Sequence, residues 1–229
     1  IRQMAKLDHP NIIPILDSGN YEDIPFLVMP FITSGSLKQR IKSHFSWQEA
    51  ANIVIQLADA LGYAHRKNII HRDVKPSNVL MDESGNPLLA DFGIAKVFDN
   101  PETIDLTTTM MGIGTPEYMA PELATSRIFD YRVDIYSLGV LFYELLTGRK
   151  PFIADTPAAV LIKHATDPLP NPTQFNPDIP REIEDILGKS LAKKPEDRFQ
   201  TAKDLANSLR DFSGLSPAPE LQPVVHKSV

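Results

Sequence analysis

The sequence contains no cysteine, which excludes disulfide bonds and metal sites built from thiolates. This absence fits a reducing compartment, so we expect a cytoplasmic location, either as a free protein or as the cytoplasmic part of a longer membrane-anchored one. An excess of basic residues is also missing, because the net charge is −6. Nucleic-acid-binding proteins usually carry a basic surface, and we therefore expect no nucleic-acid partner.

Apolar runs long enough to cross a membrane are absent too. The best candidate, residues 133–146, carries Asp134 and Glu144 and is too short, so it fits a buried core helix. The chain opens on Ile1 without an initiator Met or a signal-peptide pattern, and we expect it to be a fragment. Hydrophobic and charged contents of 42% and 23% are ordinary for a globular protein of 229 residues, which can bury one large core or two small ones.

Local patterns predict helices with a few short strands, which is an α+β fold. Ser36-x-x-Gln39 and Ser46-x-x-Glu49 are capping boxes that open a short and a long helix. Further helices are predicted over residues 1–7 and 131–147, the second closed by Gly148, and from Thr156-Pro157, Ile179-Pro180 and Thr201, with both prolines in the first turn. Strands are predicted at residues 12–16, 26–30, 79–81 and 87–89, the first two joined by a turn at residues 17–20.

Residues that carry chemistry are concentrated in the segment His71-Arg72-Asp73-Val74-Lys75-Pro76-Ser77-Asn78, directly after the long predicted helix. Asp73 can accept a hydroxyl proton, and Lys75 can neutralise charge on a group in transfer. Asn78 and the later Asp91 supply the oxygen ligands that Mg²⁺ prefers when phosphate completes its shell. This set of groups fits phosphoryl transfer to a hydroxyl; the alternative interpretation is a surface turn with chance charges.

Three motifs follow one another in the chain: residues 71–78, Asp-Phe-Gly at 91–93 and Ala-Pro-Glu at 120–122. Together they resemble the catalytic domain of Hanks-type serine/threonine protein kinases of bacterial appearance, from residue 1 to about residue 212. The resemblance implies a protein-kinase-like fold, mainly the helical large lobe with a remnant of the small β lobe. Its parts would be a small-lobe remnant at 1–30, a hinge at 31–35, a large lobe at 36–212 and a flexible tail at 213–229.

The resemblance also implies roles for the catalytic segment, with ATP, Mg²⁺ (or Mn²⁺) and a protein as the partners. Asp73 would orient the acceptor hydroxyl, Lys75 would touch the moving phosphoryl group, and Asn78 and Asp91 would hold the metal. Thr115 resembles the threonine that hydrogen-bonds the base and the lysine in Ser/Thr-directed members of the family. We therefore expect phosphorylation of Ser or Thr rather than Tyr.

Adenine is expected at the hinge, where the family binds it through backbone groups. The residues implied are Met29, Pro30 through its carbonyl and Ile32 through its N–H, with Leu80 as the apolar floor. The alternative is a plain interdomain linker.

Residues 94–113 lack periodicity and contain four threonines, which is typical of a functional or disordered loop. In the resemblance this is the activation segment, with Thr107 and Thr109 as regulatory phosphorylation sites. Arg72 would pair with the phosphate, and a dimer could phosphorylate the segment in trans. The alternative is an unmodified polar loop.

Structural roles are implied for a further group of residues. Asp134 would hold the backbone of the His71–Asp73 loop, or else would be a solvated first-turn residue. Glu122 and Arg198 would form a buried ion pair, or else a solvated one. An apolar column between the lobes would contain Met4, Ile15, His71 and Phe92, which is equally compatible with core packing.

Some features depart from the family or carry no function. The Gly-rich phosphate loop, the strand lysine and the regulatory-helix glutamate have no counterpart in the chain, so we expect the 229-residue chain alone to be inactive. Two other classes stay open: a pseudokinase or scaffold, and a small-molecule phosphotransferase of the same fold. The histidines His44, His65 and His164 show no metal-ligand spacing and are interpreted as structural or solvated.

Overall fold

The computed structural model describes residues 7–22, 24–41, 45–92, 115–126 and 129–214. Met4, Gly93, Thr107, Thr109 and the tail from residue 215 lie outside the described residues. Two separate β-hairpins and a larger set of helices form an α+β arrangement, as predicted. In chain order the elements are β1 (Asp17–Tyr21), β2 (Ile24–Val28), α1 (Leu37–Arg40), α2 (Trp47–Arg66), β3 (Val79–Met81), β4 (Pro87–Leu89), α5 (Pro121–Thr125), α6 (Arg132–Thr147), α7 (Pro157–Thr166), α8 (Arg181–Ser190) and α9 (Ala202–Ser213).

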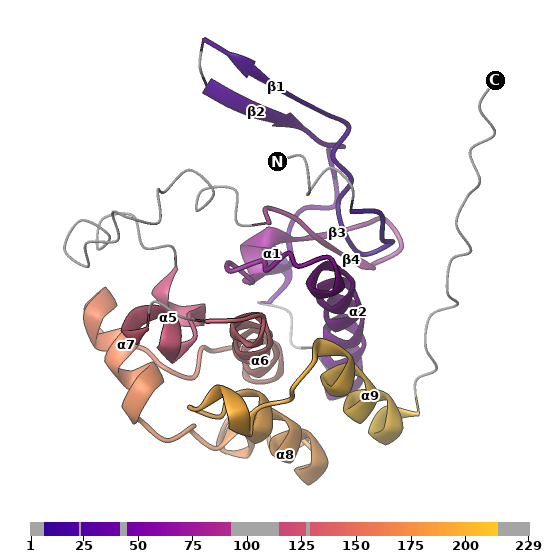
Figure 1. Cartoon of the computed structure of the whole chain (residues 1–229). Coiled ribbons are helices and arrows are strands. Elements are labelled where there is room, and N and C mark those ends of the chain that lie inside the picture. The colour runs from indigo at the N-terminus through magenta and orange to yellow at the C-terminus, as the bar shows by residue number, and fades with distance from the viewer. Residues whose placement is uncertain (1–6, 23, 42–44, 93–114, 127–128, 215–229) are drawn as a thin grey trace.

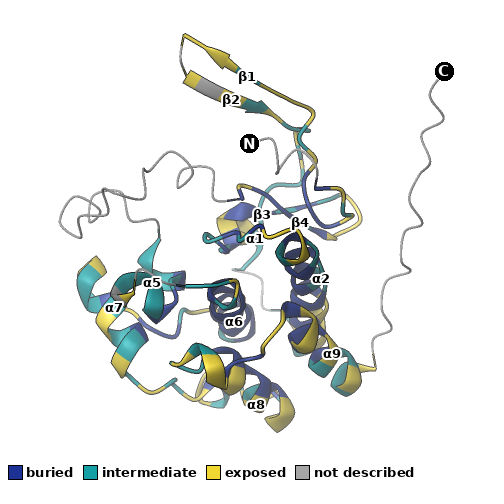
Figure 2. Ribbon diagram, viewed as in Figure 1, coloured by how far each residue is buried: buried dark blue, intermediate teal, exposed yellow. Residues whose placement is uncertain are grey.

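Two buried helices, α2 and α6, form the centre of the helical body (Figure 2). The apolar stripe of α2 packs against α6 and α9, while α6 is buried on every side from Val133 to Leu146. Arg198 and Asp134 are the charged residues most fully enclosed in this region, and both are hydrogen-bonded. In the part of the chain that the structure describes, no helix combines the length and hydropathy needed to cross a membrane.

The helix ends confirm most of the predicted signals. At the start of α2, Glu49 N–H donates to Ser46 Oγ (3.2 Å) and Ser46 N–H donates to the Glu49 carboxylate (2.8 Å), which is the predicted capping box. Helix α6 ends at Thr147 and is capped by Gly148, whose φ of +70° is the left-handed conformation that glycine adopts without strain. Helix α8 begins one residue later than predicted, because Pro180 is its N-cap rather than a first-turn residue.

The strands of the first hairpin differ from the predicted ones. The predicted strand at residues 12–16 and turn at 17–20 are wrong: β1 occupies residues 17–21, and β2 lies at 24–28 rather than 26–30. The turn falls at Glu22, which has φ of +47°. Pro14 lacks the N–H that a paired strand would use, so residues 12–16 make only isolated contacts such as Ile13 N–H to the Leu89 carbonyl (3.0 Å).

The second hairpin, β3–β4, has the predicted strands and pairs Val79 with Leu89. It lies against α2, and the catalytic segment and Asp91 adjoin its ends (Figure 1). The segment at residues 7–13 is fixed to it, because Leu89 N–H donates to the Asn11 carbonyl and Asn11 Nδ2 donates to the Pro87 carbonyl (2.8 and 2.9 Å). By contrast, the hairpin β1–β2 projects from the body and exposes Tyr21 and Ile24.

Candidate functional site

The loop between α2 and β3 brings a carboxylate, an ammonium and an amide together. Lys75 Nζ lies 2.7 Å from Asp73 Oδ2. Asn78 Nδ2 donates to the same carboxylate oxygen and to the Asp73 carbonyl, both at 2.9 Å. Asp73 and Lys75 are partly exposed and Asn78 is buried, so the carboxylate is held from one side and open to solvent on the other. This arrangement can accept a proton and neutralise an incoming anion at the same place.

His71 ties this loop to the end of β4. Its Nε2–H donates to the Ala90 carbonyl (2.9 Å), because a carbonyl can only accept, and Nδ1 therefore accepts the Asp73 N–H (3.2 Å). Complete burial lowers the pKa of His71, although Asp134 and the neighbouring carboxylates act in the opposite direction. The ring also packs on Phe92, with centroids 4.6 Å apart. A neutral, oriented imidazole thus fixes the distance between the loop and the Asp91 region.

Asp91 is placed beside Asn78 by the backbone. Ala90 N–H donates to the Asn78 carbonyl (2.8 Å), so the next residue, Asp91, emerges at the same end of the hairpin. Asp91 is exposed and has φ of +58°, a conformation that costs a non-glycine residue about 1–3 kcal/mol. Such strain is common at functional sites and aims a side chain that an ordinary backbone would turn elsewhere.

Asp134, at the start of α6, holds the loop from below. Its completely buried carboxylate accepts the N–H groups of His71 and Arg72 and contacts His65 Nε2, each at 2.8 Å. Burial alone would raise the pKa of Asp134, but the bonds from His65 and His71 outweigh it and hold the pKa below its ordinary value. The Asp134 carboxylate is therefore ionised. It stabilises Arg72 in its left-handed conformation, with φ of +66°.

The guanidinium of Arg72 is not fully hydrogen-bonded within the described residues. The group lies over the Phe129 ring at 5.1 Å. Its Nε is buried without a hydrogen-bond acceptor among the described residues. An anion close to the loop would satisfy this donor.

The residues expected to bind adenine come from the segment after β2 and from β3. Leu80 in β3 pairs with Ser36 in an isolated bridge, and Met81 N–H donates to the Gly35 carbonyl (3.0 Å), so the end of the 31–35 segment is fixed to β3. Met29 lines a small cavity of about 20 Å³ together with Ile15, Asp91 and Phe92. The Pro30 carbonyl and the Ile32 N–H have no partner within the described residues, which leaves both groups available to a ligand.

A cation at this site would need ligands from a bound substrate. The described residues contain no cluster of three His, Cys, Asp or Glu side chains able to hold a metal alone. Asn78 and Asp91 offer one amide and one carboxylate oxygen, both hard donors suited to Mg²⁺ with phosphate oxygens and water in the remaining positions. The donor set therefore fits a magnesium ion that arrives with a nucleotide.

The segment from Thr115 to Glu122 is attached to the helical body. Glu122 receives a two-pronged contact from Arg198, with Nη–O distances of 2.6 and 2.8 Å. The Arg198 side chain is completely buried and also donates to three backbone carbonyls. Thr115 lies at the start of this segment; within the described part of the chain its hydroxyl makes no hydrogen bond to Asp73 or Lys75.

His65 contacts Asp134, which agrees with its interpretation as a structural histidine, but the sequence did not indicate this partner. Its position near the end of α2, one helix before the catalytic loop, was the available signal, but it requires knowing how α2 and α6 pack. Tyr118 was also missed. Its hydroxyl hydrogen-bonds the nearly buried Glu144, and burial raises its pKa.

Comparisons with known proteins identify the same family as the sequence motifs. Residues 1–209 match the family profile described as "Protein kinase domain". A probable serine/threonine-protein kinase of Clostridium perfringens is 40% identical over 208 residues, which is 90% of this chain and 30% of that protein. The serine/threonine-protein kinase PrkC of Bacillus subtilis is 36% identical over 90% of this chain and 32% of its own length. PknB of Mycobacterium leprae is 37% identical over 95% and 36%, so the chain spans about a third of the length of these curated relatives.

Proposed function

This chain belongs to the protein kinase family, and on that premise we propose that it transfers the γ-phosphoryl group of ATP to Ser or Thr hydroxyls of a protein. The observation that carries the proposal is the cluster of Asp73, Lys75 and Asn78, with Asp91 beside it. The Ser/Thr-directed names of the relatives support the choice of acceptor. The reaction consumes ATP, and we therefore place it in the cytoplasm.

In the proposed mechanism the protein mainly positions groups and balances charge. The open face of Asp73 receives the acceptor hydroxyl and takes its proton as the oxygen attacks the γ-phosphorus. Lys75, held 2.7 Å from Asp73, neutralises the equatorial oxygens of the moving phosphoryl group. Asn78 keeps the Asp73 carboxylate in place through its amide, and Thr115 would border the acceptor.

Asn78 and Asp91 would hold Mg²⁺ (or Mn²⁺), which when bound neutralises the phosphate oxygens and screens the leaving diphosphate. Adenine would lie between Met29 and Leu80, with hydrogen bonds to the Pro30 carbonyl and the Ile32 N–H. The contact of the His71 and Phe92 rings would keep Asp91 in position relative to the catalytic loop.

For regulation we propose that phosphate on Thr107 or Thr109 pairs with Arg72. The buried Arg72 Nε that lacks an acceptor among the described residues supports this role. A dimer in which one copy phosphorylates the other would supply the modification.

We further propose that the 229-residue polypeptide by itself does not bind Mg-ATP with micromolar affinity. It has no counterpart of the Gly-rich loop amides, the strand lysine and the helix glutamate of the family. At least three charge-assisted phosphate contacts are missing, each worth roughly 1.5–3 kcal/mol. Micromolar binding corresponds to about 8 kcal/mol in total, so little affinity would remain. Isothermal titration with Mg-ATP measures this, and a dissociation constant in the micromolar range would contradict it.

The proposed activity is tested with an upstream-extended protein, in which a segment that carries a Gly-rich loop and a strand lysine is placed before Ile1. Radiolabelled ATP is supplied with a casein-like protein and, in parallel, with an aminoglycoside. We expect label on Ser and Thr of the protein only. Label on the aminoglycoside would favour a small-molecule phosphotransferase, and no label with either acceptor would favour a pseudokinase or scaffold.

A further inference from the structure

His164 on α7 is a completely buried polar residue that the proposed mechanism does not use. It lies between two elements that are distant in the sequence. Its Nε2 is 3.1 Å from the Glu117 carbonyl, and its Nδ1 is 2.9 Å from the Tyr136 hydroxyl of α6. Because the carbonyl can only accept, Nε2 carries the proton and Nδ1 accepts from Tyr136.

The imidazole is held neutral and in one orientation. Burial lowers the pKa of His164 to about 4, although the bond to the Glu117 carbonyl acts in the opposite direction. The Phe152 ring packs on it edge-on, with centroids 4.9 Å apart. Behind it, Lys193 Nζ donates to the His164 backbone carbonyl at 2.8 Å, which fixes the end of α7. The donor aimed at Glu117 therefore persists through the neutral pH range.

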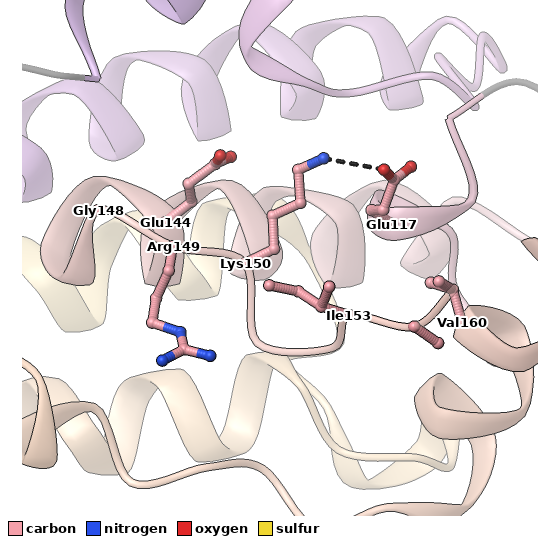
Figure 3. A pocket seen from close by; sticks show the side chains of 8 residues that line it. Glu117, Glu144, Gly148, Arg149, Lys150, Ile153 and Val160 are labelled. Atoms are coloured by element: carbon pink, nitrogen blue, oxygen red, sulfur yellow. Dashed lines mark hydrogen bonds and ion pairs between the residues drawn. The ribbon is translucent and has the colours of Figure 1, made fainter. Parts of the chain in front are cut away.

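The residue that receives this hydrogen bond lies in the segment that begins with Thr115, which the proposed function places at the acceptor hydroxyl. Glu117 is the middle residue of the short 3₁₀ turn Pro116–Tyr118, directly after Thr115. Lys150 Nζ donates to Glu117 Oε1 at 3.0 Å. Both residues line an open cavity of about 330 Å³, together with Glu144 and Ile153 (Figure 3). A partly exposed ion pair of this kind contributes only about 0–1 kcal/mol, so it restrains the turn weakly.

The hydrogen bond from His164 is different because its donor is a completely buried imidazole that Tyr136 holds in one orientation. Without this fixed donor the Glu117 carbonyl loses its restraint, and we expect the backbone of the turn to move. The other end of the same segment, Glu122, is fixed by Arg198, whose guanidinium lies over the Tyr136 ring at 4.7 Å. The segment is thus held at Glu117 by His164 of α7 and at Glu122 by Arg198, which lies between α8 and α9.

We propose that His164 is a positioning residue that sets the backbone at residues 115–118 to receive the protein substrate. It acts through the Glu117 carbonyl and touches neither nucleotide nor acceptor hydroxyl. This inference rests on the proposed kinase function. It predicts that the hydrogen bond to Glu117 governs the KM of the protein substrate and leaves the KM of ATP unchanged.

Two isosteric variants separate the two hydrogen bonds of the imidazole. The amide of His164→Gln reaches the position of Nε2 and can still donate to the Glu117 carbonyl. The shorter amide of His164→Asn reaches only the position of Nδ1, so it keeps a partner for Tyr136 and loses Glu117. Tyr136→Phe is the matched control, because it removes the hydroxyl contact and keeps the ring under Arg198.

The test measures steady-state phosphorylation of a casein-like protein by the upstream-extended protein, varying protein and ATP separately, with a thermal melt of each variant. We expect His164→Asn to raise the KM of the protein by about 5- to 50-fold with the KM of ATP within about twofold. His164→Gln and Tyr136→Phe should stay within about threefold of wild type. If His164→Asn and His164→Gln change the KM of the protein equally, His164 has a purely structural role. The same follows if His164→Asn folds and its KM for the protein is unchanged.

If His164→Asn does not fold, the KM of the protein measured with His164→Gln tests the inference. A KM for the protein within about threefold supports the inference, and a rise of about tenfold with an unchanged melting temperature overturns it. The failure of the proposed function looks different, because the wild-type protein would then label no protein at all.

Discussion

Replacing Asp134 with Asn tests how the catalytic loop is supported. The carboxylate uses one oxygen for the Arg72 N–H and the other for the His71 N–H and His65 Nε2, all at 2.8 Å. An asparagine amide offers a single acceptor, so its NH₂ group must face at least one buried N–H donor. The substitution is nearly isosteric, and its effect therefore reports the hydrogen bonds rather than a cavity.

The magnitude follows from the burial of these partners. Hydrogen bonds to a charged group contribute about 1.5–3 kcal/mol each, and an unpaired buried donor costs about as much again. For the two backbone donors together we expect Asp134→Asn to lower the free energy of unfolding by about 3–5 kcal/mol. This is a large share of the roughly 5–15 kcal/mol of a typical domain.

Urea unfolding of the 229-residue chain, followed by far-UV circular dichroism, measures the change. Asp185→Asn on the exposed face of α8 is the matched control, and we expect it to stay within about 0.5 kcal/mol of wild type. A loss below about 1 kcal/mol for Asp134→Asn would refute the reasoning, since the loop would then hold its conformation without the carboxylate.

Three further predictions concern the buried polar groups. Arg198→Met leaves the Glu122 carboxylate without its partner, and we expect a loss of about 3–5 kcal/mol in urea unfolding; an unchanged midpoint would count against a buried pair. Tyr143→Phe removes a buried hydroxyl that has no partner among the described residues, and a melting temperature equal to or above wild type is expected, whereas a drop of several degrees would contradict it. Because the folded-state pKa of His164, about 4, lies below its ordinary 6.5, the unfolded state binds the proton first. Wild type should therefore lose about 2–3 kcal/mol relative to His164→Gln as the pH falls from 7 to 4, and parallel pH curves for the two proteins would disprove this.

Much of the helical body could be predicted from local signals. The capping boxes at Ser46 and Thr201 and the left-handed glycine at Gly148 are properties of a few neighbouring residues, and the structure confirms them. The β1–β2 hairpin was misplaced because its pairing depends on partners across the turn rather than on local propensity. β1 has no apolar alternation, and Asp17-Ser18-Gly19-Asn20 is equally compatible with a turn.

The candidate site was predictable as a set of residues, but its contacts were not. The sequence places Asp73, Lys75 and Asn78 within one loop, and their proximity follows directly. The contacts of His65 with Asp134 and of His164 with Glu117 join residues far apart in the chain. They depend on how α2, α6 and α7 pack, which no local pattern records.

The most direct test of the central claim is a single-turnover measurement on the upstream-extended protein and its Asp73→Asn variant. Mg-ATP binding is measured separately by titration. If Asp73 is the group that receives the hydroxyl proton, transfer to Ser and Thr should fall by about 10²–10⁴-fold while Mg-ATP affinity stays within about threefold. Transfer at the wild-type rate by Asp73→Asn would contradict the account.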